Sequence, residues 1–350
     1  MVPLLGESRT FTRYGLTVLN KTKNLGIQKL LAAAGVADEL GRPKKGPFNA
    51  YTVGFQLVPR LNAAGRMDHA NTAFGLLMAE SPAEAEQLAA QLNKNNSDRQ
   101  KLTEQMVTEA RNYIKQTKQE NQSCLFVFKE GWATGLLGLV AGKLKDEYYK
   151  PAMVMGQSED GEILGSGRSI EEFDMIAALQ SLPELFSKFG GHPRACGFSI
   201  KKEVTLEQMQ KALLSKTDKI LSSVELKPKI FIDTEVDLDD VNWKLYDLLE
   251  KFEPFGQNNE EPTYAARDLT VTAVEPVGQD GKHLRLMVKH KSHSIRKTIG
   301  FGLGDINRCE MDWKTCLKPG DKIDMAFTIG VNEWNGNREL QLTIEDIKKV

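Results

Sequence analysis

Apolar residues recur at helical spacing through the first third of the chain and at alternate positions through the last third. Between residues 10 and 35 this spacing predicts two short helices, separated near residues 24–26. Residues 1–9 fit neither pattern, and Pro3 and Gly6 interrupt them, so we expect a loop there. The first part of the chain should therefore be irregular and then helical.

One long helix is expected to begin after Ser81. This serine is placed to cap the helix, Pro82 suits its first turn, and Glu84 completes a capping box. Apolar positions continue at helical spacing toward Lys118, with at most one break near residues 93–97. Such a helix would be about 55 Å long. Because its apolar stripe is thin, we expect it to connect two domains.

The middle of the chain alternates between short apolar runs and stretches of helical spacing, which is typical of an α/β layer. Strands are expected at residues 124–128, 151–155 and 163–169, and helices at residues 135–148, 173–182 and 206–221. A sheet with helices packed on it should therefore follow the long helix.

A glycine-rich segment, Phe189–Ser199, lies between the last two of these helices. Glycine lets the backbone approach a ligand closely, so Gly190 and Gly191 could present amide groups to an anion, with His192 beside them. We interpret the segment as a phosphate-facing loop. The alternative is a plain turn before a strand, and the residues of the segment alone do not decide between the two.

The last third of the chain contains several short runs with a two-residue period. Residues 227–229 form a linker, which a strand at residues 230–233 and a helix at residues 243–252 should follow. Further strands are expected at residues 269–274, 283–288, 297–301, 322–329 and 339–344, with a hairpin turn at Asn335-Gly336. This strand count predicts a small closed barrel of the OB-fold type, which offers a groove to single-stranded nucleic acid. The alternative is a β-sandwich without a ligand.

The composition is that of an ordinary globular protein. The chain has 350 residues, 41% of them hydrophobic, which suits two or three domains. No apolar run approaches the roughly 20 residues that span a bilayer, and the start lacks the features of a signal peptide, so we expect a cytoplasmic location. The cysteines form no C-x-x-C pair and are interpreted as free thiols; they are Cys124, Cys196, Cys309 and Cys316.

Positive charge is unevenly distributed, although the net charge is −1. Residues 282–297 contain six Lys and Arg residues and no carboxylate. Such a stretch is typical of a surface that binds a polyanion or, alternatively, of a face that is only solvated. Arg60 and Arg66 flank Asn62–Gly65, an expected loop with little side-chain bulk, and arginine matches phosphate oxygens well. Ordinary ionic surface is the alternative for these two arginines. Asp68 is assigned to a helix N-terminus rather than to a metal site.

A series of motifs resembles the RecJ-type single-strand-specific exonucleases of the DHH phosphoesterase superfamily. The resemblance covers nearly all of the chain and rests on the segments at residues 2–9, 59–66, 132–141, 165–169, 189–192, 252–262 and 281–284. Residues 59–66, Pro-Arg-Leu-Asn-Ala-Ala-Gly-Arg, are similar to the Arg-x-Asn-Ala-Ala-Gly-Arg motif of the family. The resemblance implies an α/β plus β fold with the end of a DHH domain at 1–80, a connecting helix at 81–120, a DHHA1 domain at 121–226 and an OB-fold domain at 227–350.

The resemblance implies a part in degrading single-stranded DNA from 5′ to 3′, in DNA repair and recombination. The residues implied to bind the terminal phosphate and the adjacent backbone are Arg60, Asn62, Arg66, Ser166, Arg168 and Ser169. Gly190, Gly191 and His192 would face the scissile phosphate, with His192 as a hydrogen-bond donor to the developing negative charge. Without the resemblance, His192 is as well explained as a structural residue.

The same resemblance assigns the trailing strand to the OB-fold domain. The residues expected to contact its phosphates are Lys282, His283 and Arg285. Phe301 or Trp334 would stack on bases, and packing in the barrel core is the alternative for each. Single-stranded DNA is the implied ligand, and single-strand-binding protein or other repair proteins are the partners that the resemblance allows.

Catalysis in the family needs a divalent metal, Mn²⁺ or Mg²⁺, held by aspartates and an Asp-His-His triplet. The chain contains no Asp-His-His and no aspartate before Asp38. We therefore expect a fragment or an internally started product that binds DNA without holding the metal. Two alternatives stay open. The chain could be a non-catalytic single-strand-binding protein or subunit, or a related phosphodiesterase that acts on oligonucleotides or cyclic dinucleotides.

Overall fold

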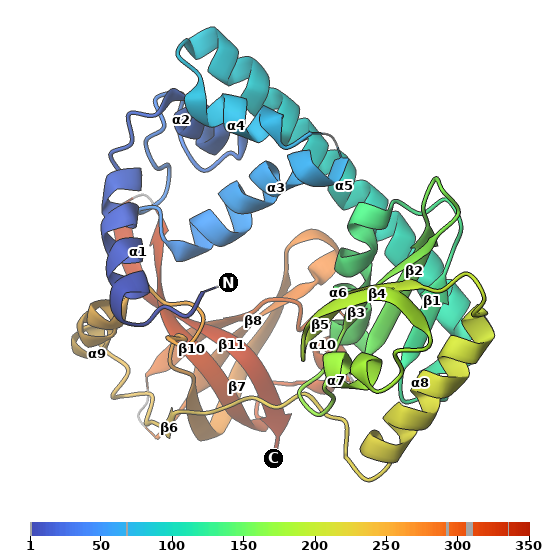
Figure 1. Cartoon of the computed structure of the whole chain (residues 1–350). Coiled ribbons are helices and arrows are strands. Elements are labelled where there is room, and N and C mark those ends of the chain that lie inside the picture. The colour runs from blue at the N-terminus through green and yellow to red at the C-terminus, as the bar shows by residue number, and fades with distance from the viewer. Residues whose placement is uncertain (1, 68, 292–293, 306–310, 335) are drawn as a thin grey trace. The chain divides into compact units, whose positions relative to one another are not determined.

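The computed structural model describes residues 2–67, 69–291, 294–305, 311–334 and 336–350, with the side chains of Met67 and Trp334 left out (Figure 1). The chain divides into two compact units. The first unit comprises Met1–Lys23, Gly35–Gln56 and Ile230–Val350, and the second comprises Asn24–Ala34 and Leu57–Lys229. None of the described helices is long and apolar enough to cross a membrane.

The second unit contains most of the helices. Its helices are α2 (Leu25–Ala33), α3 (Val58–Met67), α4 (Asn71–Met78), α5 (Pro82–Gln116), α6 (Leu137–Tyr148), α7 (Met175–Gln180) and α8 (Leu206–Leu221). The predicted start of the long helix is confirmed, because the Ser81 Oγ accepts a hydrogen bond from the Glu84 amide at 3.2 Å. Helix α5 runs for 35 residues without the break that we allowed near residues 93–97.

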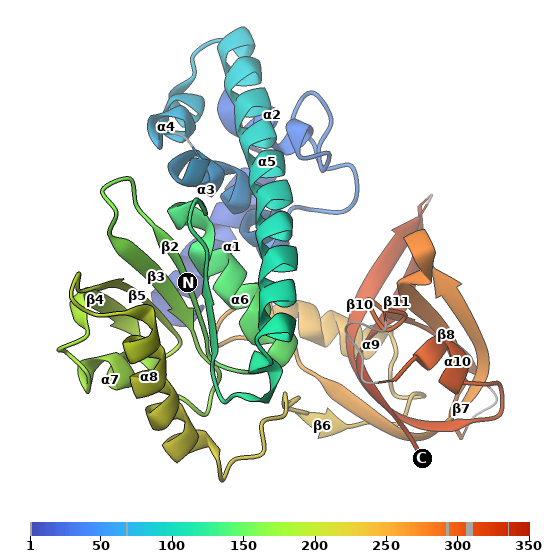
Figure 2. The same cartoon turned by 90° about the vertical axis from the view of Figure 1, so that its right-hand side faces the viewer.

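A five-stranded sheet forms the centre of the second unit (Figure 2). The strands are β1 (Leu125–Phe128), β2 (Ala152–Gln157), β3 (Ile163–Arg168), β4 (Phe186–His192) and β5 (Ala195–Ile200), in the order β1-β2-β3-β5-β4. Alternate side chains enter opposite cores. Leu125 and Val127 pack with α5 and α6, whereas Phe126 and Met153 pack with α7 and α8. The predicted α/β layer is confirmed.

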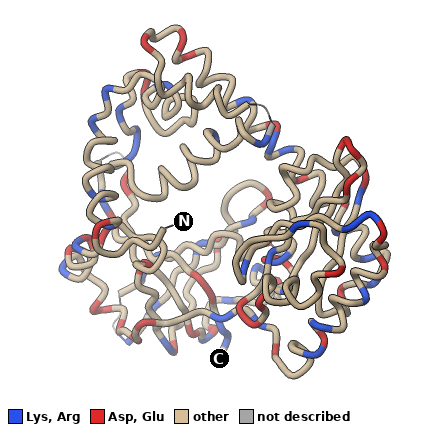
Figure 3. The backbone as a smooth tube through the Cα atoms, viewed as in Figure 1, with Lys and Arg blue, Asp and Glu red and all other residues tan. Residues whose placement is uncertain are grey.

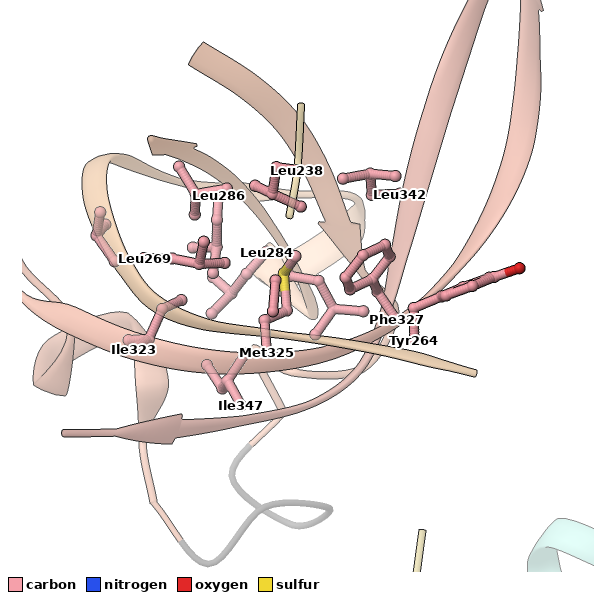
Figure 4. Packing of buried hydrophobic residues seen from close by; sticks show 14 of the residues in the cluster. Leu238, Tyr264, Leu269, Leu284, Leu286, Ile323, Met325, Phe327, Leu342 and Ile347 are labelled. Carbon is pink, nitrogen blue, oxygen red and sulfur yellow. The ribbon is translucent and has the colours of Figure 1, made fainter. Parts of the chain in front are cut away.

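The first unit contains the predicted barrel. Its strands are β6 (Thr234–Glu235), β7 (Tyr264–Val277), β8 (His283–Lys289), β9 (Ile295–Gly300), β10 (Lys322–Trp334) and β11 (Asn337–Lys349). Strands β7, β8, β9, β11 and β10 pair in this order, and pairing of β10 with β7 closes the ring. Leu286, Met325 and Phe327 are fully buried inside it (Figure 4). Closure confirms the barrel and excludes the β-sandwich.

The first unit also contains three helices, α1 (Gly6–Leu19), α9 (Trp243–Leu249) and α10 (Trp313–Cys316). Short helical turns occur in both units; they are η1 (Thr52–Leu57), η2 (Gln119–Asn121), η3 (Thr134–Leu136), η4 (Glu250–Phe252) and η5 (Gln279–Gly281). The predicted strand at residues 230–233 is wrong. Only Thr234 and Glu235 pair with β7, because Asp233 is tied by its backbone and side chain to Thr263 outside the ladder.

The loop predicted for residues 1–9 is also wrong, since α1 begins at Gly6. Two long-range contacts order this segment. The Leu4 amide donates to the Gln257 carbonyl at 2.8 Å, and the Arg9 Nη2 donates to the carbonyls of residues 251, 252 and 253 at 3.1, 2.9 and 3.2 Å. These partners lie more than 240 residues away, so no local pattern could reveal them.

Candidate functional site

The segment with the two motif arginines is a helix, α3, and not the predicted loop. Ala63 and Ala64 are fully buried, and their small side chains let α3 pack closely on α5. Alanine also favours the helix intrinsically. Arg60 and Arg66 are therefore held on one rigid element, about 9 Å apart along its axis. Asn62 is exposed on the same helix.

Each of these arginines is anchored to a different element of the second unit. The Arg60 Nε donates to the Asn93 Oδ1 on α5 at 2.9 Å. The Arg66 Nη1 donates to the Gly135 carbonyl at 2.8 Å. A Cβ at Gly135 would lie 3.1 Å from the Arg66 carbonyl oxygen, so glycine permits this close approach. The end of α3 is thereby attached to the segment that begins α6.

Arg168 and Ser166 lie side by side on β3. The Arg168 Nη1 donates to the Ser166 Oγ at 2.9 Å and to the Gly167 carbonyl at 2.8 Å. A Cβ at Gly138 would come within 2.7 Å of the Arg168 Nη2 and 3.0 Å of the Ser166 Oγ. Gly138 is in the first turn of α6, where backbone amides favour an anion. A guanidinium, a hydroxyl and a helix N-terminus thus meet at one point.

The predicted loop at Phe189–Ser199 is a hairpin of β4 and β5, and its turn is Pro193-Arg194. The backbone at Gly190 and Gly191 pairs with β5, so the interpretation as an amide-lined loop is wrong. Gly191 has φ +145°, and a Cβ there would lie 2.3 Å from the Ala195 carbonyl oxygen. Glycine is needed at this position because the two strands approach so closely.

The strand register brings His192 and Arg168 to one face of the sheet. Arg168 pairs with Ala195, and Ala195 pairs with His192. Directly paired residues project to the same face, so the two side chains stand about two strand spacings, or roughly 10 Å, apart. On the same face, Ser166 pairs with Gly197, and Gly197 pairs with Gly190. A Cβ at Gly190 would meet no atom within 4 Å. An open glycine floor thus lies beside the Arg168 pocket, and the side chain of His192 is exposed at its far side.

The site carries more positive charge than the sequence motifs indicate, because Arg99 of α5 belongs to it. Burial lowers the pKa of Arg60, Arg99 and Arg168, and repulsion between the guanidinium groups lowers it further. Arg99 acts on Arg60, and Arg66 acts on both Arg99 and Arg168. Within the described ranges, no carboxylate forms an ion pair with Arg66, Arg99 or Arg168. Arg66, Arg99 and Arg168 therefore form a cationic group without a carboxylate partner among the described residues.

Sequence reasoning missed Arg99, although a signal was present. The buried stripe of α5 is apolar at Ala85, Ala89 and Leu92, and it then becomes polar at Asn96, with half-buried Arg99 three residues further on. Polar residues in the buried stripe of a long helix indicate a packed polar site. One candidate is removed at the same time. Ser169 is 4% exposed and its hydroxyl donates to the Phe173 carbonyl at 2.6 Å, so it faces the interior.

The basic stretch in the barrel is partly neutralised by its neighbours. Figure 3 shows basic and acidic residues interspersed over the barrel strands. Residues 282–297 contain no carboxylate, but other segments supply them. The ion pairs are Arg285–Glu275 at 3.3 Å, Lys291–Asp237 at 3.3 Å and Lys297–Glu339 at 3.9 Å. Arg296 donates to the carbonyls of Leu238 and Val241. Much of the stretch therefore holds the barrel together.

The remaining barrel candidates differ in exposure. The His283 Nδ1 accepts a hydrogen bond from the Gly302 amide at 3.0 Å, which gives this histidine a structural task. Phe301 is 57% exposed and contacts the His283 ring edge-on, so it is surface and not barrel core. Lys282 forms no ion pair in the part of the chain that the structure describes. Asp68, Cys309 and the side chain of Trp334 lie outside the described residues.

Two protein-family models match parts of this architecture. The DHHA1 domain matches residues 121–222, which include Ser166, Arg168 and the β4–β5 hairpin. The RecJ OB domain matches residues 232–346, which make up the barrel. The chain is therefore similar to the part of RecJ proteins that contains the DHHA1 and OB domains.

RecJ proteins of several bacteria are similar to the chain over almost its whole length. The single-stranded-DNA-specific exonuclease RecJ of Bacillus subtilis is 32% identical over 99% of this chain and 42% of its own length. The protein of the same name from Salmonella typhimurium is 30% identical over 99% of this chain and 59% of its own length. The chain thus spans about half the length of these relatives.

RecJ from Thermus thermophilus shares the fold. Its crystal structure in complex with Mn²⁺ aligns with a TM-score of 0.81 at 23% identity, covering 100% of this chain and 48% of that one. The structure in complex with Mg²⁺ aligns with a TM-score of 0.79 at 22% identity, over 100% and 50%. In this chain, no three His, Cys, Asp or Glu residues of the described ranges lie close enough together to hold a metal ion. The described residues thus offer no such set of ligands.

Proposed function

We propose that the chain supplies the strand-binding part of a single-stranded-DNA-specific 5′–3′ exonuclease, with the terminal 5′ phosphate held by Arg168 and Ser166. One observation carries the proposal. The guanidinium of Arg168 is packed beside the Ser166 hydroxyl and the first turn of α6, in space that Gly138 leaves free, without a described carboxylate partner. Charge-assisted hydrogen bonds from such a group suit a phosphate. The name shared by the curated relatives supports the same substrate.

The strand would continue from this pocket across the glycine floor. Gly197 and Gly190 leave the face of β5 and β4 bare, so a sugar-phosphate backbone could lie directly on it. His192 stands at the far side of that floor, where it can donate a hydrogen bond to the negative charge that develops during cleavage. Arg60 and Arg66 would hold the neighbouring phosphates from α3.

Hydrolysis would use a divalent metal, for which the described residues offer no set of ligands. Such an ion supplies an activated water and stabilises the leaving oxygen. RecJ of Thermus thermophilus has been solved with Mg²⁺ and with Mn²⁺, and we propose that the ligands come from the part of RecJ proteins that this chain does not match. Lys282 and the exposed Phe301 of the barrel would receive the trailing strand, where stacking contributes about 1–3 kcal/mol per base. The proposed setting is DNA repair and recombination.

The preference for a phosphorylated end tests the proposal. The chain is titrated, in EDTA, with single-stranded oligodeoxythymidine that ends in a 5′ phosphate or a 5′ hydroxyl. The wild type should bind the phosphorylated strand more tightly, and Arg168→Ala should abolish the difference. Arg111→Ala is the matched control. Arg111 lies away from the pocket, and its Nε forms an ion pair with the Glu147 Oε2 at a distance of 2.9 Å. A preference that survives in Arg168→Ala contradicts the assignment.

A further inference from the structure

The middle of α5 contains buried polar atoms without partners. Asn96 is 3% exposed, and its Oδ1 accepts no hydrogen bond from the described residues. The Nδ2 of Asn95 and the Nε of Arg99 are likewise buried and unpaired within the described ranges. Buried polar atoms in proteins are nearly always hydrogen-bonded. Their grouping on one helix indicates that an external group completes this site.

The chemistry of the unpaired atoms indicates what that group is. Asn95 and Arg99 are four residues apart, so their side chains are neighbours on the helix surface. The Asn96 Oδ1 is an acceptor, whereas the Asn95 Nδ2 and the Arg99 Nε are both donors, and Arg99 carries a guanidinium. An acceptor with several oxygens and negative charge satisfies both, and a phosphodiester is such an acceptor.

The position of Arg99 along α5 relates it to the other arginines. Asn93, which accepts from Arg60, lies six residues earlier, or about 9 Å along the axis. Further along the helix, Met106 and Ala110 pack with Leu136 and Leu137. Leu136 and Leu137 lie between Gly135, which contacts Arg66, and Gly138, which contacts Arg168. Arg99 therefore lies between the anchor of Arg60 and the segment that holds Arg66 and Arg168.

The repulsions described above reproduce this order. Arg66 lowers the pKa of Arg168 and Arg99, and Arg99 lowers the pKa of Arg60, so the interacting pairs follow the series Arg168, Arg66, Arg99, Arg60. Helix packing holds these like charges together, and an anion placed between them would relieve the repulsion. A polyanion with regularly spaced charges fits such a series better than a single small anion does.

We propose that Arg99, with Asn95 beside it, binds an internal phosphate of the single strand, between the phosphates held by Arg66 and Arg60. This inference rests on the proposed function, which places the terminal phosphate at Arg168. It adds a contact from the connecting helix that none of the recognised motifs contains. The long helix is then part of the binding surface.

The salt dependence of binding tests the role of Arg99. The chain is titrated with 5′-phosphorylated oligodeoxythymidine over a range of NaCl concentrations, in EDTA. Arg99→Gln should weaken binding about tenfold through the lost charged hydrogen bonds. It should also make the slope of log K against log salt less steep by about 0.7, the contribution of one phosphate on a single strand. The preference for a 5′ phosphate should stay as in the wild type. Arg99→Lys should keep the slope, because it keeps the charge.

Lys101→Gln is the matched control. It removes one positive charge from the exposed side of the same helix and should leave affinity and slope unchanged. A wild-type slope in Arg99→Gln overturns the inference, and so does an equal change in Lys101→Gln. If Arg99→Gln lowers the thermal midpoint, Asn95→Ala takes its place, and unchanged affinity in that variant overturns the inference. Failure of the proposed function is distinguishable, because the wild type itself would then show no 5′-phosphate preference.

Discussion

Gly138 of α6 lies directly against Arg168 of β3, so closely that a Cβ on the glycine would come within 2.7 Å of the Arg168 Nη2. The absence of a side chain at one position therefore decides where a guanidinium can rest at another. The first prediction uses this relationship.

Gly138→Ala should displace Arg168 and weaken the binding of 5′-phosphorylated single strands about tenfold, which is the effect of disturbing a charged hydrogen bond. The fold should survive, because alanine is favoured over glycine in a helix by about 1 kcal/mol. Gly142→Ala on the same helix is the control, since a Cβ there meets no atom within 4 Å. Anisotropy titrations in which the two variants behave alike would refute the packing argument.

Arg9→Ala should destabilise the first unit. The Arg9 Nη2 donates to three carbonyls of residues 251–253, and hydrogen bonds from a charged donor contribute about 1.5–3 kcal/mol. Urea unfolding followed by tryptophan fluorescence measures the change, because Trp243 and Trp313 belong to this unit. Arg13→Ala, an exposed arginine on the same helix, should have little effect. Equal midpoints for all three proteins would show that the contact is not stabilising.

Cys196 should resist alkylation at pH 8. Burial raises the pKa of its thiol to about 11, although the Gly167 backbone and Arg168 act in the opposite direction. The thiolate is the reactive form, so a raised pKa keeps the group protonated until the pH approaches that value. Half-buried Cys316 should react faster, and Cys196 should react once urea unfolds the chain. Peptide mapping after iodoacetamide treatment measures both sites, and modification of native Cys196 as fast as Cys316 would be inconsistent with its burial.

The chain should bind single strands without cleaving them. The described residues offer no group of His, Cys, Asp or Glu that fits a metal ion, and therefore no centre at which added Mn²⁺ would activate water. Release of nucleotides from 5′-labelled strands should stay at the level without enzyme, whereas EDTA should not reduce binding. Sustained, Mn²⁺-dependent release would require a metal site that the fold does not display.

Local patterns were sufficient wherever a signal lies within a few neighbouring residues. The capping box at Ser81 predicted the start of α5, and the alternation of apolar residues predicted the strands of the barrel. The motif at residues 59–66 drew attention to Arg60 and Arg66, and the one at residues 165–169 to Arg168. Hydrogen-bonded caps and residue periodicity depend on the chain's own local geometry, so they can be read from the sequence.

Only the tertiary structure decided which of these residues act together. The segment that we expected to be a loop is a helix, in which Ala63 and Ala64 are buried against α5. The register of β3, β5 and β4 places Arg168 and His192 on one face of the sheet. Carboxylates from outside the basic stretch, such as Glu339 beside Lys297, neutralised part of it, and Arg99 joined the arginine cluster from a helix that composition assigned to a connecting role. The physical reason is the same in each case. Burial, pairing and charge compensation depend on residues far apart in the chain, and no window of sequence contains both partners.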